Sequence, residues 1–267
     1  MPPSCWLPAP PEGKACRWDR WWKSSTTRGP YWSSNASPRP AERPVRPDEL
    51  VLVLASSSPR RQELLARLGL EFITVTPAVD ETRRVGESPI VHVQRVARDK
   101  ASAAVAAAPH LPVLAADTSV VLGDEILGKP TDPGDAERML RLLRSRAHTV
   151  LTATAVRWGE RGASHLEAAR VEFTSFSDEL LRWYLGTGEY RDKAGAYAVQ
   201  GRGALLVARV EGNVQAVVGL PLARLPALLA AVGLRLCARE ARLTLCAAAE
   251  LTAGTGSPPA AAINPRT

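Results

Sequence analysis

An aspartate inside an apolar run is the first residue of this sequence whose type points to chemistry. Asp117 lies within "VLAADTSVVL", residues 113–122, and the β-branched and apolar residues around it predict a strand. Aspartate is depleted from strands, and burying its carboxylate without a partner costs free energy. A metal ligand or a general base would account for a charged carboxylate there. The structural alternative is an exposed carboxylate at a strand end or a bulge.

A second carboxylate follows the strand-like segment "FITVTPAV", residues 72–79. Glu81 is the candidate for a second oxygen ligand to the same cation, and its neighbour Asp80 competes for the role. The spacing of the residues does not separate the two.

Three basic residues are candidates for binding an anion, and the first two stand where local structure does not favour a cation. Arg60 lies in the first turn of a predicted helix, at the positive end of the helix dipole, where acidic residues are preferred. Lys100 falls on the apolar face of a later helix. Lys129, in "GKP", closes the hairpin that carries Asp117. Solvated or snorkelling side chains are the alternative for Arg60 and Lys100, but all three are also placed to bind a phosphate group.

The turn before that first helix is rich in serine. Ser58 precedes a proline, as an N-cap residue does, and we interpret Ser56 and Ser58 as part of a turn that faces a phosphate. The glycines and lysine of a P-loop are absent from this turn. The adjacent Arg61 is left open between a solvated side chain and a ligand contact.

A stretch of small residues, "RDKAGAYAVQGRG" at 191–203, would let backbone approach a ligand closely. Its Gln200 carries an amide that can donate to and accept from the edge of a base. The cations, carboxylates and small-residue loop together favour a polyphosphate ligand with a bound divalent metal ion.

The elements that must position these residues alternate between strands and helices. This alternation, with both hairpins and helical crossovers, predicts an α/β fold with a mixed sheet. Strands are expected at 52–56, 72–79, 113–122, 125–130, 148–158, 166–176, 204–212 and 214–219, and helices after Ser58, Ser88, Asp132, Ser177 and Leu220.

The two ends of the chain differ from its middle. Residues 1–49 hold ten of the 22 prolines and five of the seven tryptophans, and are expected to form a disordered extension. An Ala-rich tail is expected at 235–267, beginning with a short helix. Residues 50–234 form the expected domain. Of the net charge of +7, +3 falls in residues 1–50 and +2 in 235–267, which leaves about +2 for the body.

That distribution of charge gives no basic stripe for a nucleic acid. All four cysteines also lie in the two end segments, so a disulfide framework and a cysteine zinc site are not expected in the body. No apolar run spans a bilayer, and the N-terminus lacks the apolar core of a secretory signal. We therefore expect a cytoplasmic protein without membrane or nucleic-acid partners.

Several of these segments, in this order, resemble the Maf proteins, which are nucleoside triphosphate pyrophosphatases of the inosine-triphosphatase-like superfamily. The resemblance covers about residues 51–233 and implies a twisted mixed sheet with a cleft between two lobes. The matching segments are "LASSSPRRQELLARLG", "VDET", "RVARDKA", "AADTSVVL", "GKP", "HTVLTATAV", "DKAGAYAVQG" and "VVGLPL".

The resemblance implies hydrolysis of a nucleoside triphosphate to the monophosphate and pyrophosphate. In that mechanism Asp117 accepts the proton of the attacking water, and Arg60, Lys100 and Lys129 hold the phosphates. Glu81 and Asp117 contact Mg²⁺ or Mn²⁺. A homodimer and a role in cleaning the nucleotide pool are implied as well.

Two branches of the family differ near the base. The branch acting on dTTP and UTP has Asp-Thr and a glutamine loop, which matches Thr118 and Gln200, with Arg60 as the third specificity position. The branch preferring 7-methyl-GTP usually has Asp-Gln. Two other functions compete with pyrophosphatase activity: a nucleotide-binding regulator of cell division, which the family's link to septum formation favours, and a nucleic-acid-binding protein, which only the overall charge favours.

Overall fold

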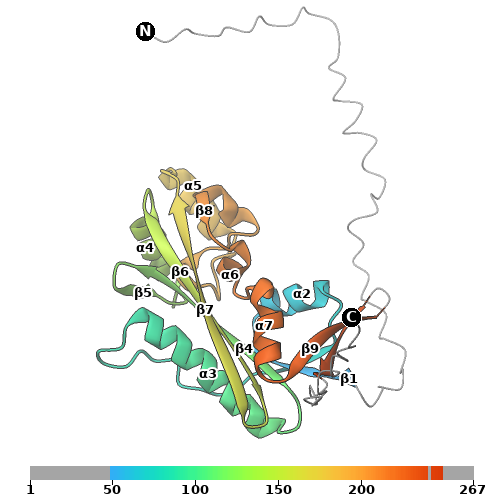
Figure 1. Ribbon diagram of the computed structural model, residues 1–267. Coiled ribbons are helices and arrows are strands. Elements are labelled where there is room, and N and C mark those ends of the chain that lie inside the picture. The colour runs from blue at the N-terminus through green and yellow to red at the C-terminus, as the bar shows by residue number, and fades with distance from the viewer. Residues whose placement is uncertain (1–48, 240–241, 249–267) are drawn as a thin grey trace, which may run out of the picture. The chain divides into compact units, whose positions relative to one another are not determined.

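The computed structural model describes residues 49–239 and 242–248 (Figure 1). The predicted extension at 1–49, apart from its last residue, lies outside these ranges, as does most of the predicted tail at 235–267. Within the described ranges, no helix is long and apolar enough to cross a bilayer.

A seven-stranded mixed sheet forms the centre of the fold, as predicted. Its strands run in the order β3-β2-β4-β6-β7-β8, and β5 pairs with the outer part of β4. The pairs β2–β3 and β2–β4 are parallel, and the remaining pairs are antiparallel. The strands are β2 (Leu52–Ala55), β3 (Phe72–Val75), β4 (Val113–Leu122), β5 (Glu125–Leu127), β6 (Ala147–Trp158), β7 (Arg161–Phe173) and β8 (Val207–Glu211).

Helices cover both faces of this sheet. Proline begins each of the first three, and the side chains of Ser88, Asp132 and Ser177 accept the capping hydrogen bonds of α3, α4 and α5. The α-helices are α2 (Pro59–Arg67), α3 (Pro89–Ala107), α4 (Pro133–Leu143), α5 (Asp178–Gly186), α6 (Val214–Val218) and α7 (Leu225–Ala231), and the 3₁₀ turns are η1 (Ala194–Ala196), η2 (Arg202–Leu206) and η3 (Leu222–Arg224).

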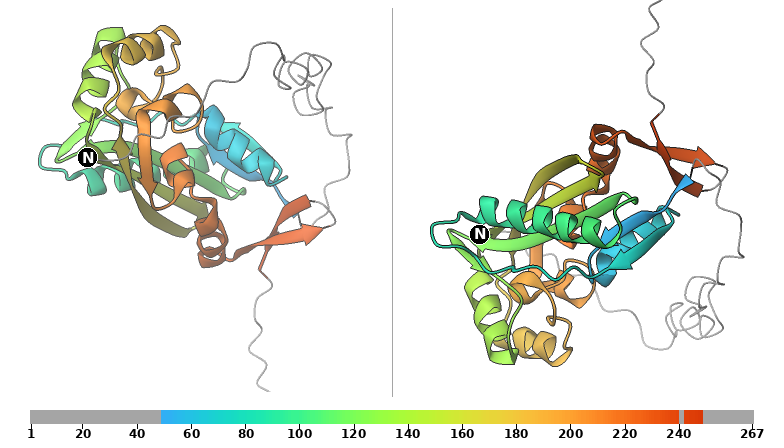
Figure 2. Two further views of the ribbon diagram at one scale, coloured as in Figure 1. Left: turned by 90° about the horizontal axis from the view of Figure 1, so that it is seen from above. Right: turned by 90° about the horizontal axis from the view of Figure 1, so that it is seen from below.

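The alternation of side chains along β2 and β4 assigns each residue to one of two cores. Leu52 and Leu54 of β2 pack into a core shared with α2 and α7, whereas Val53 and Ala55 pack against α3. In β4, Leu114 and Ala116 belong to the first core, whereas Val113, Ala115 and Val121 belong to the core against α3. Figure 2 shows α3 on one side of the strands, with α2 and α7 on the other.

A third core forms a second lobe. It joins α4 and α5 to the far ends of β4, β6 and β7, and its largest members include Leu140, Phe173 and Tyr184. The fold is thus the α/β arrangement with two lobes that the sequence predicted.

Residues 214–219, predicted as a strand, instead form helix α6. The side chain of Asn213 caps this helix by accepting a hydrogen bond from the backbone N–H of Gln215. Gly219 ends it with φ 116°, in the left-handed conformation that favours glycine. A short apolar run does not distinguish a strand from a buried helical turn by its periodicity, and the flanking cap residues decide here.

The short helix predicted at the start of the tail is also wrong. Strands β9 (Leu234–Arg239) and β10 (Arg242–Ala247) form an antiparallel pair, and β10 pairs with β1 (Glu49–Leu50). Leu234 and Leu245 are buried in the core under α7. Their alternation with polar residues fits a strand better than a helix, because every second residue reaches that core.

Acid is expected to destabilise the second lobe through His148. This side chain is 3% exposed, and its Nε2 lies 2.8 Å from the hydroxyl of Tyr197. Burial lowers the pKa of His148 from 6.5 to about 4. Between these values the unfolded state binds more protons, so the free energy of unfolding falls as the pH falls, by on the order of 3 kcal/mol. Urea titrations from pH 7 to pH 4 measure this slope. In a His148→Gln variant the same slope would contradict the assignment.

Candidate active site

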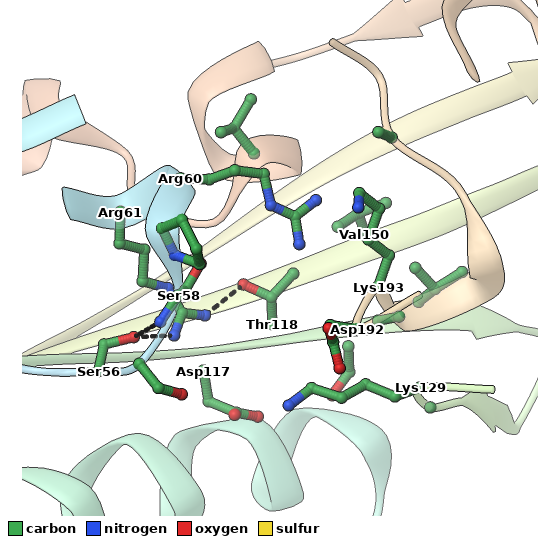
Figure 3. A pocket seen from close by; sticks show the side chains of 18 of the residues that line it. Ser56, Ser58, Arg60, Arg61, Asp117, Thr118, Lys129, Val150, Asp192 and Lys193 are labelled. Atoms are coloured by element: carbon green, nitrogen blue, oxygen red, sulfur yellow. Dashed lines mark hydrogen bonds between the residues drawn. The ribbon is translucent and has the colours of Figure 1, made fainter. Parts of the chain in front are cut away.

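One cavity of about 920 Å³ gathers all the sequence-predicted site residues (Figure 3). Its walls come from the β2–α2 turn, the segment after β3, the middle of β4, the end of the β4–β5 hairpin and the loop after α5. The predicted residues that line it are Ser56, Ser58, Arg60, Glu81, Lys100, Asp117, Thr118, Lys129 and Gln200.

The register of β4 explains why the cavity opens at this point. β2 pairs with β4 only up to Ala115, and β5 pairs with it only from Val120. Among the described strands, residues 116–119 of β4 therefore have a neighbour on the β6 side only. This gap lies beyond the carboxyl end of β2, which is the place where open α/β sheets bind ligands.

Asp117 and Thr118 are consecutive in β4 and so point to opposite faces of the sheet. Asp117 lies on the face that α3 covers, and Thr118 lies on the face of α2 and α6. The carboxylate of Asp117 and the hydroxyl of Thr118 thus reach the same gap in the sheet from its two faces.

The ammonium group of Lys100 joins the two carboxylates that the sequence singled out. Its Nζ lies 2.8 Å from Oδ1 of Asp117 and 2.9 Å from Oε1 of Glu81. Lys100 and Asp117 each keep only 11% of their side-chain surface exposed. Asp80 turns elsewhere: hydrogen bonds from the side chain and then the backbone N–H of Thr82 lower the pKa of its carboxyl. The geometry therefore favours Glu81 over Asp80.

Arg61 is buried, so the solvated alternative for this residue is wrong. It is 8% exposed, and three of its nitrogens donate hydrogen bonds: Nε to the carbonyl of Gly219 at 2.9 Å, Nη1 to Oγ of Ser56 at 3.0 Å and Nη2 to Oγ1 of Thr118 at 3.1 Å. A Cβ at position 219 would lie 3.2 Å from Oγ1 of Thr118 and 3.3 Å from Nε of Arg61. The glycine thus admits the arginine to this wall of the cavity.

Thr118 is held from its other side as well. Its Oγ1 lies 2.9 Å from Oγ1 of Thr152, which donates to the carbonyl of Ala216 at 2.7 Å. These contacts fix the rotamer of Thr118 beside the cavity and connect it to α6.

The N-terminus of α2 also faces the cavity. Ser58 occupies the N-cap position as predicted, but its side chain makes no capping hydrogen bond, and its own N–H donates to Oγ of Ser56 at 3.2 Å. The first-turn N–H groups therefore receive no cap from this serine, and the positive end of the helix is directed to the site.

Arg60, Lys129 and Lys193 are among the cations that line the cavity without an ion pair to another described residue. The guanidinium group of Arg60 extends from α2 into the cavity, and the ammonium group of Lys129 points toward Asp117 (Figure 3). Burial lowers the pKa of Arg60. Burial, followed by the charge of Arg60, also lowers the pKa of Lys193. Cations without a close ion-pair partner suit an anionic ligand.

Lys193 was missed by the sequence reasoning, although it belongs to the small-residue stretch at 191–203. The interpretation of that stretch also changes. Gly195, at φ 68°, packs on Val120, where an added Cβ would lie 2.9 Å from Cγ1. The small residue thus lets the loop approach strand β4.

Glu189 holds the rest of this loop and was likewise missed. Its carboxylate accepts hydrogen bonds from the N–H groups of Arg202 at 3.1 Å and Gly203 at 2.8 Å. The turn around the carboxylate presents Gln200, an exposed residue, at the cavity wall.

Two of the acidic side chains that line the cavity lie close enough together to share a metal ion. No group of three His, Cys, Asp or Glu side chains with metal-binding geometry occurs in the described part of the chain. Glu81 and Asp117 converge on the ammonium group of Lys100, so this pair of carboxylates could hold a divalent cation; Glu63, Glu189 and Asp192 also line the cavity. Mg²⁺ is usually bound by one or two carboxylates together with substrate phosphates and water, and this pair fits that pattern.

The known proteins that this chain resembles indicate its family. Residues 51–232 match the family described as Maf-like protein. The chain belongs to the Maf family. A dTTP/UTP pyrophosphatase of Shewanella denitrificans is 50% identical over 188 residues, covering 67% of this Maf chain and 95% of the relative. One of Myxococcus xanthus is 47% identical and covers 71% and 96%, respectively. The Staphylococcus aureus Ham1 protein structure, at 16% identity, overlaps 46% of this chain and 72% of its own with a TM-score of 0.36.

Proposed function

We propose that this Maf protein hydrolyses dTTP, UTP and modified pyrimidine analogues at the bond between the α- and β-phosphates. The observation that carries the proposal is the pairing of Asp117 and Glu81 with one lysine, in a cavity that Arg60, Lys129 and Lys193 also line. That arrangement provides carboxylate oxygens for water and metal in the same cavity as positive charge for a triphosphate. The relatives named dTTP/UTP pyrophosphatase support the choice of substrate.

In this reaction Asp117 takes a proton from the attacking water, and the anhydride bond between the α- and β-phosphates breaks. Lys100 holds the carboxylate of Asp117 in place before attack, because the two side chains are 2.8 Å apart. Arg60 and Lys129 neutralise the phosphates, so that water approaches a less negative group and pyrophosphate leaves. We assign Lys193 to the same phosphate-binding set.

Mg²⁺ or Mn²⁺ held by Glu81 and Asp117 would polarise phosphate oxygens and stabilise the charge that develops on them. Lys100 already contacts both carboxylates and keeps them in one place.

Base selection is assigned to Thr118, Gln200 and Arg60, with Ser56 and Ser58 forming the phosphate-facing turn. Thr118 matches the residue that the resemblance gives to the dTTP/UTP branch, so 7-methyl-GTP is the less favoured substrate.

A nucleotide-binding regulator of cell division does not need a lysine-paired aspartate in a strand, so the geometry favours catalysis. The homodimer and the cytoplasmic location stay predictions.

The test is a panel of natural and modified triphosphates incubated with the full chain and Mg²⁺ or Mn²⁺, with pyrophosphate release as the readout. We expect dTTP and UTP to be cleaved well above dCTP, dATP and 7-methyl-GTP. Absence of pyrophosphate from dTTP, UTP and their 5-substituted analogues would overturn the proposed function.

A further inference from the structure

A buried arginine outside the cavity donates hydrogen bonds to the backbone on both sides of Glu81. Arg95 of α3 is 8% exposed and is not among the residues that line the cavity. Its Nη2 donates to the carbonyl of Thr82 at 2.9 Å, and its Nη1 donates to the carbonyl of Asp80 at 3.3 Å. These two carbonyls belong to the residues on either side of Glu81, so one guanidinium group holds both flanks of that residue.

The other edge of the guanidinium group is anchored by Glu87. Nε and Nη2 of Arg95 lie 2.7 Å and 3.0 Å from the two carboxylate oxygens of Glu87, which is also buried. The same carboxylate accepts the N–H of Arg84 at 3.0 Å. Arg95 therefore joins α3 to the loop at several points, with its charge matched by a buried acid.

This anchoring matters because Glu81 has little else to fix it. Its side chain is 53% exposed, and residues 76–84 form neither helix nor strand. Yet its Oε1 lies 2.9 Å from Nζ of Lys100, which stands on the same helix as Arg95. Holding an exposed glutamate on an irregular segment costs conformational entropy, and backbone contacts made in advance reduce that cost.

We propose that Arg95 is a positioning residue that sets Glu81 for metal binding by gripping the carbonyls on both sides of it. The inference rests on the metal role proposed for Glu81. Arginine suits the task because its planar fork reaches a carboxylate and two carbonyls at once, whereas a lysine has a single nitrogen.

The experiment compares Arg95→Lys with the wild-type chain in two measurements. Hydrogen exchange of the segment around residues 80–83 should become faster, while exchange in the core of α3 stays unchanged. Mn²⁺ binding, followed by electron paramagnetic resonance with a dTTP analogue that has a methylene group between the α- and β-phosphorus atoms, should weaken about tenfold, as is usual when a supporting contact of a metal ligand is lost.

Glu81→Gln should weaken Mn²⁺ binding to at least the same extent. Adding Arg95→Lys to Glu81→Gln should cause no further loss, because the arginine acts through the glutamate. Two controls should leave binding unchanged: Arg98→Lys, at an exposed position of the same helix, and Asp99→Asn, which removes a partner of Arg95 that does not touch the loop.

Unchanged exchange at residues 80–83, unchanged Mn²⁺ binding in Arg95→Lys, or losses that multiply in the double variant would each overturn the proposal. If Arg95→Lys does not fold, Glu87→Gln loosens the same anchor and is expected to give the same two changes. Glu81→Gln with wild-type Mn²⁺ binding would remove the metal role and this proposal with it. Failure of the wild-type chain to release pyrophosphate is a separate result, and it counts against the proposed function only.

Discussion

Replacing Asp117 with Asn is expected to lower the turnover of dTTP by on the order of 10²–10⁴-fold, the contribution typical of a positioned general base. Asparagine has nearly the same shape but cannot take the proton of water. Lys100 loses one carboxylate but keeps Glu81 at 2.9 Å, so its charge stays paired. The loss should therefore appear in the rate of pyrophosphate release and leave thermal unfolding nearly unchanged.

Asp124→Asn is the matched control, because it makes the same chemical change at an exposed turn of the strand hairpin that carries Asp117. It should release pyrophosphate at the wild-type rate. An Asp117→Asn protein that keeps its activity would remove the proton-acceptor role from this residue.

Removing Arg60 is expected to lower activity, and removing Arg61 is expected to lower stability. Arg60→Ala removes an unpaired cation from the cavity, so kcat/KM for dTTP should fall on the order of 10²-fold, with little change in Tm. Arg61→Ala removes the donor to Ser56, Thr118 and Gly219. Buried acceptors left without donors should lower the free energy of unfolding by about 3 kcal/mol, and Tm by roughly 6–12 °C.

Steady-state kinetics measures the loss of activity in Arg60→Ala, and differential scanning fluorimetry measures the loss of stability in Arg61→Ala. Arg67→Ala, at an exposed position in the last turn of the same helix, should alter neither quantity. A Tm for Arg61→Ala equal to the wild-type value would contradict the structural role of Arg61. Wild-type kcat/KM in Arg60→Ala would contradict the phosphate-binding role of Arg60.

The sequence predicted the position of Asp117 and Lys100 because each breaks a local rule. An acid in a strand and a lysine on an apolar helical face both need a partner, and the two side chains prove to be each other's partner. The choice between Asp80 and Glu81 was not predictable. Their segment has no periodicity, and its course depends on hydrogen bonds from Arg95, a residue distant along the chain from both.

Arg61 carried a signal that the sequence reasoning did not use. It lies three, four and seven residues before Leu64, Leu65 and Leu68, on the apolar face of α2, so the helix turns it inward. The partner of Arg61 could not be predicted in the same way, because the carbonyl of Gly219 lies 158 positions away in the chain and is brought close only by the tertiary fold. Likewise, β9 and β10 form where a helix was predicted because their alternating leucines reach a core that only the folded chain provides.

The pleat of β4 bears on how the substrate preference of such an enzyme can change in evolution. Because Asp117 and Thr118 are neighbours in sequence but lie on opposite faces, a substitution at Thr118 changes its contacts with Arg61 and Thr152 and leaves the Lys100 pair of Asp117 in place. Under the roles proposed for these two residues, base preference and bond cleavage are therefore separately mutable at adjacent codons.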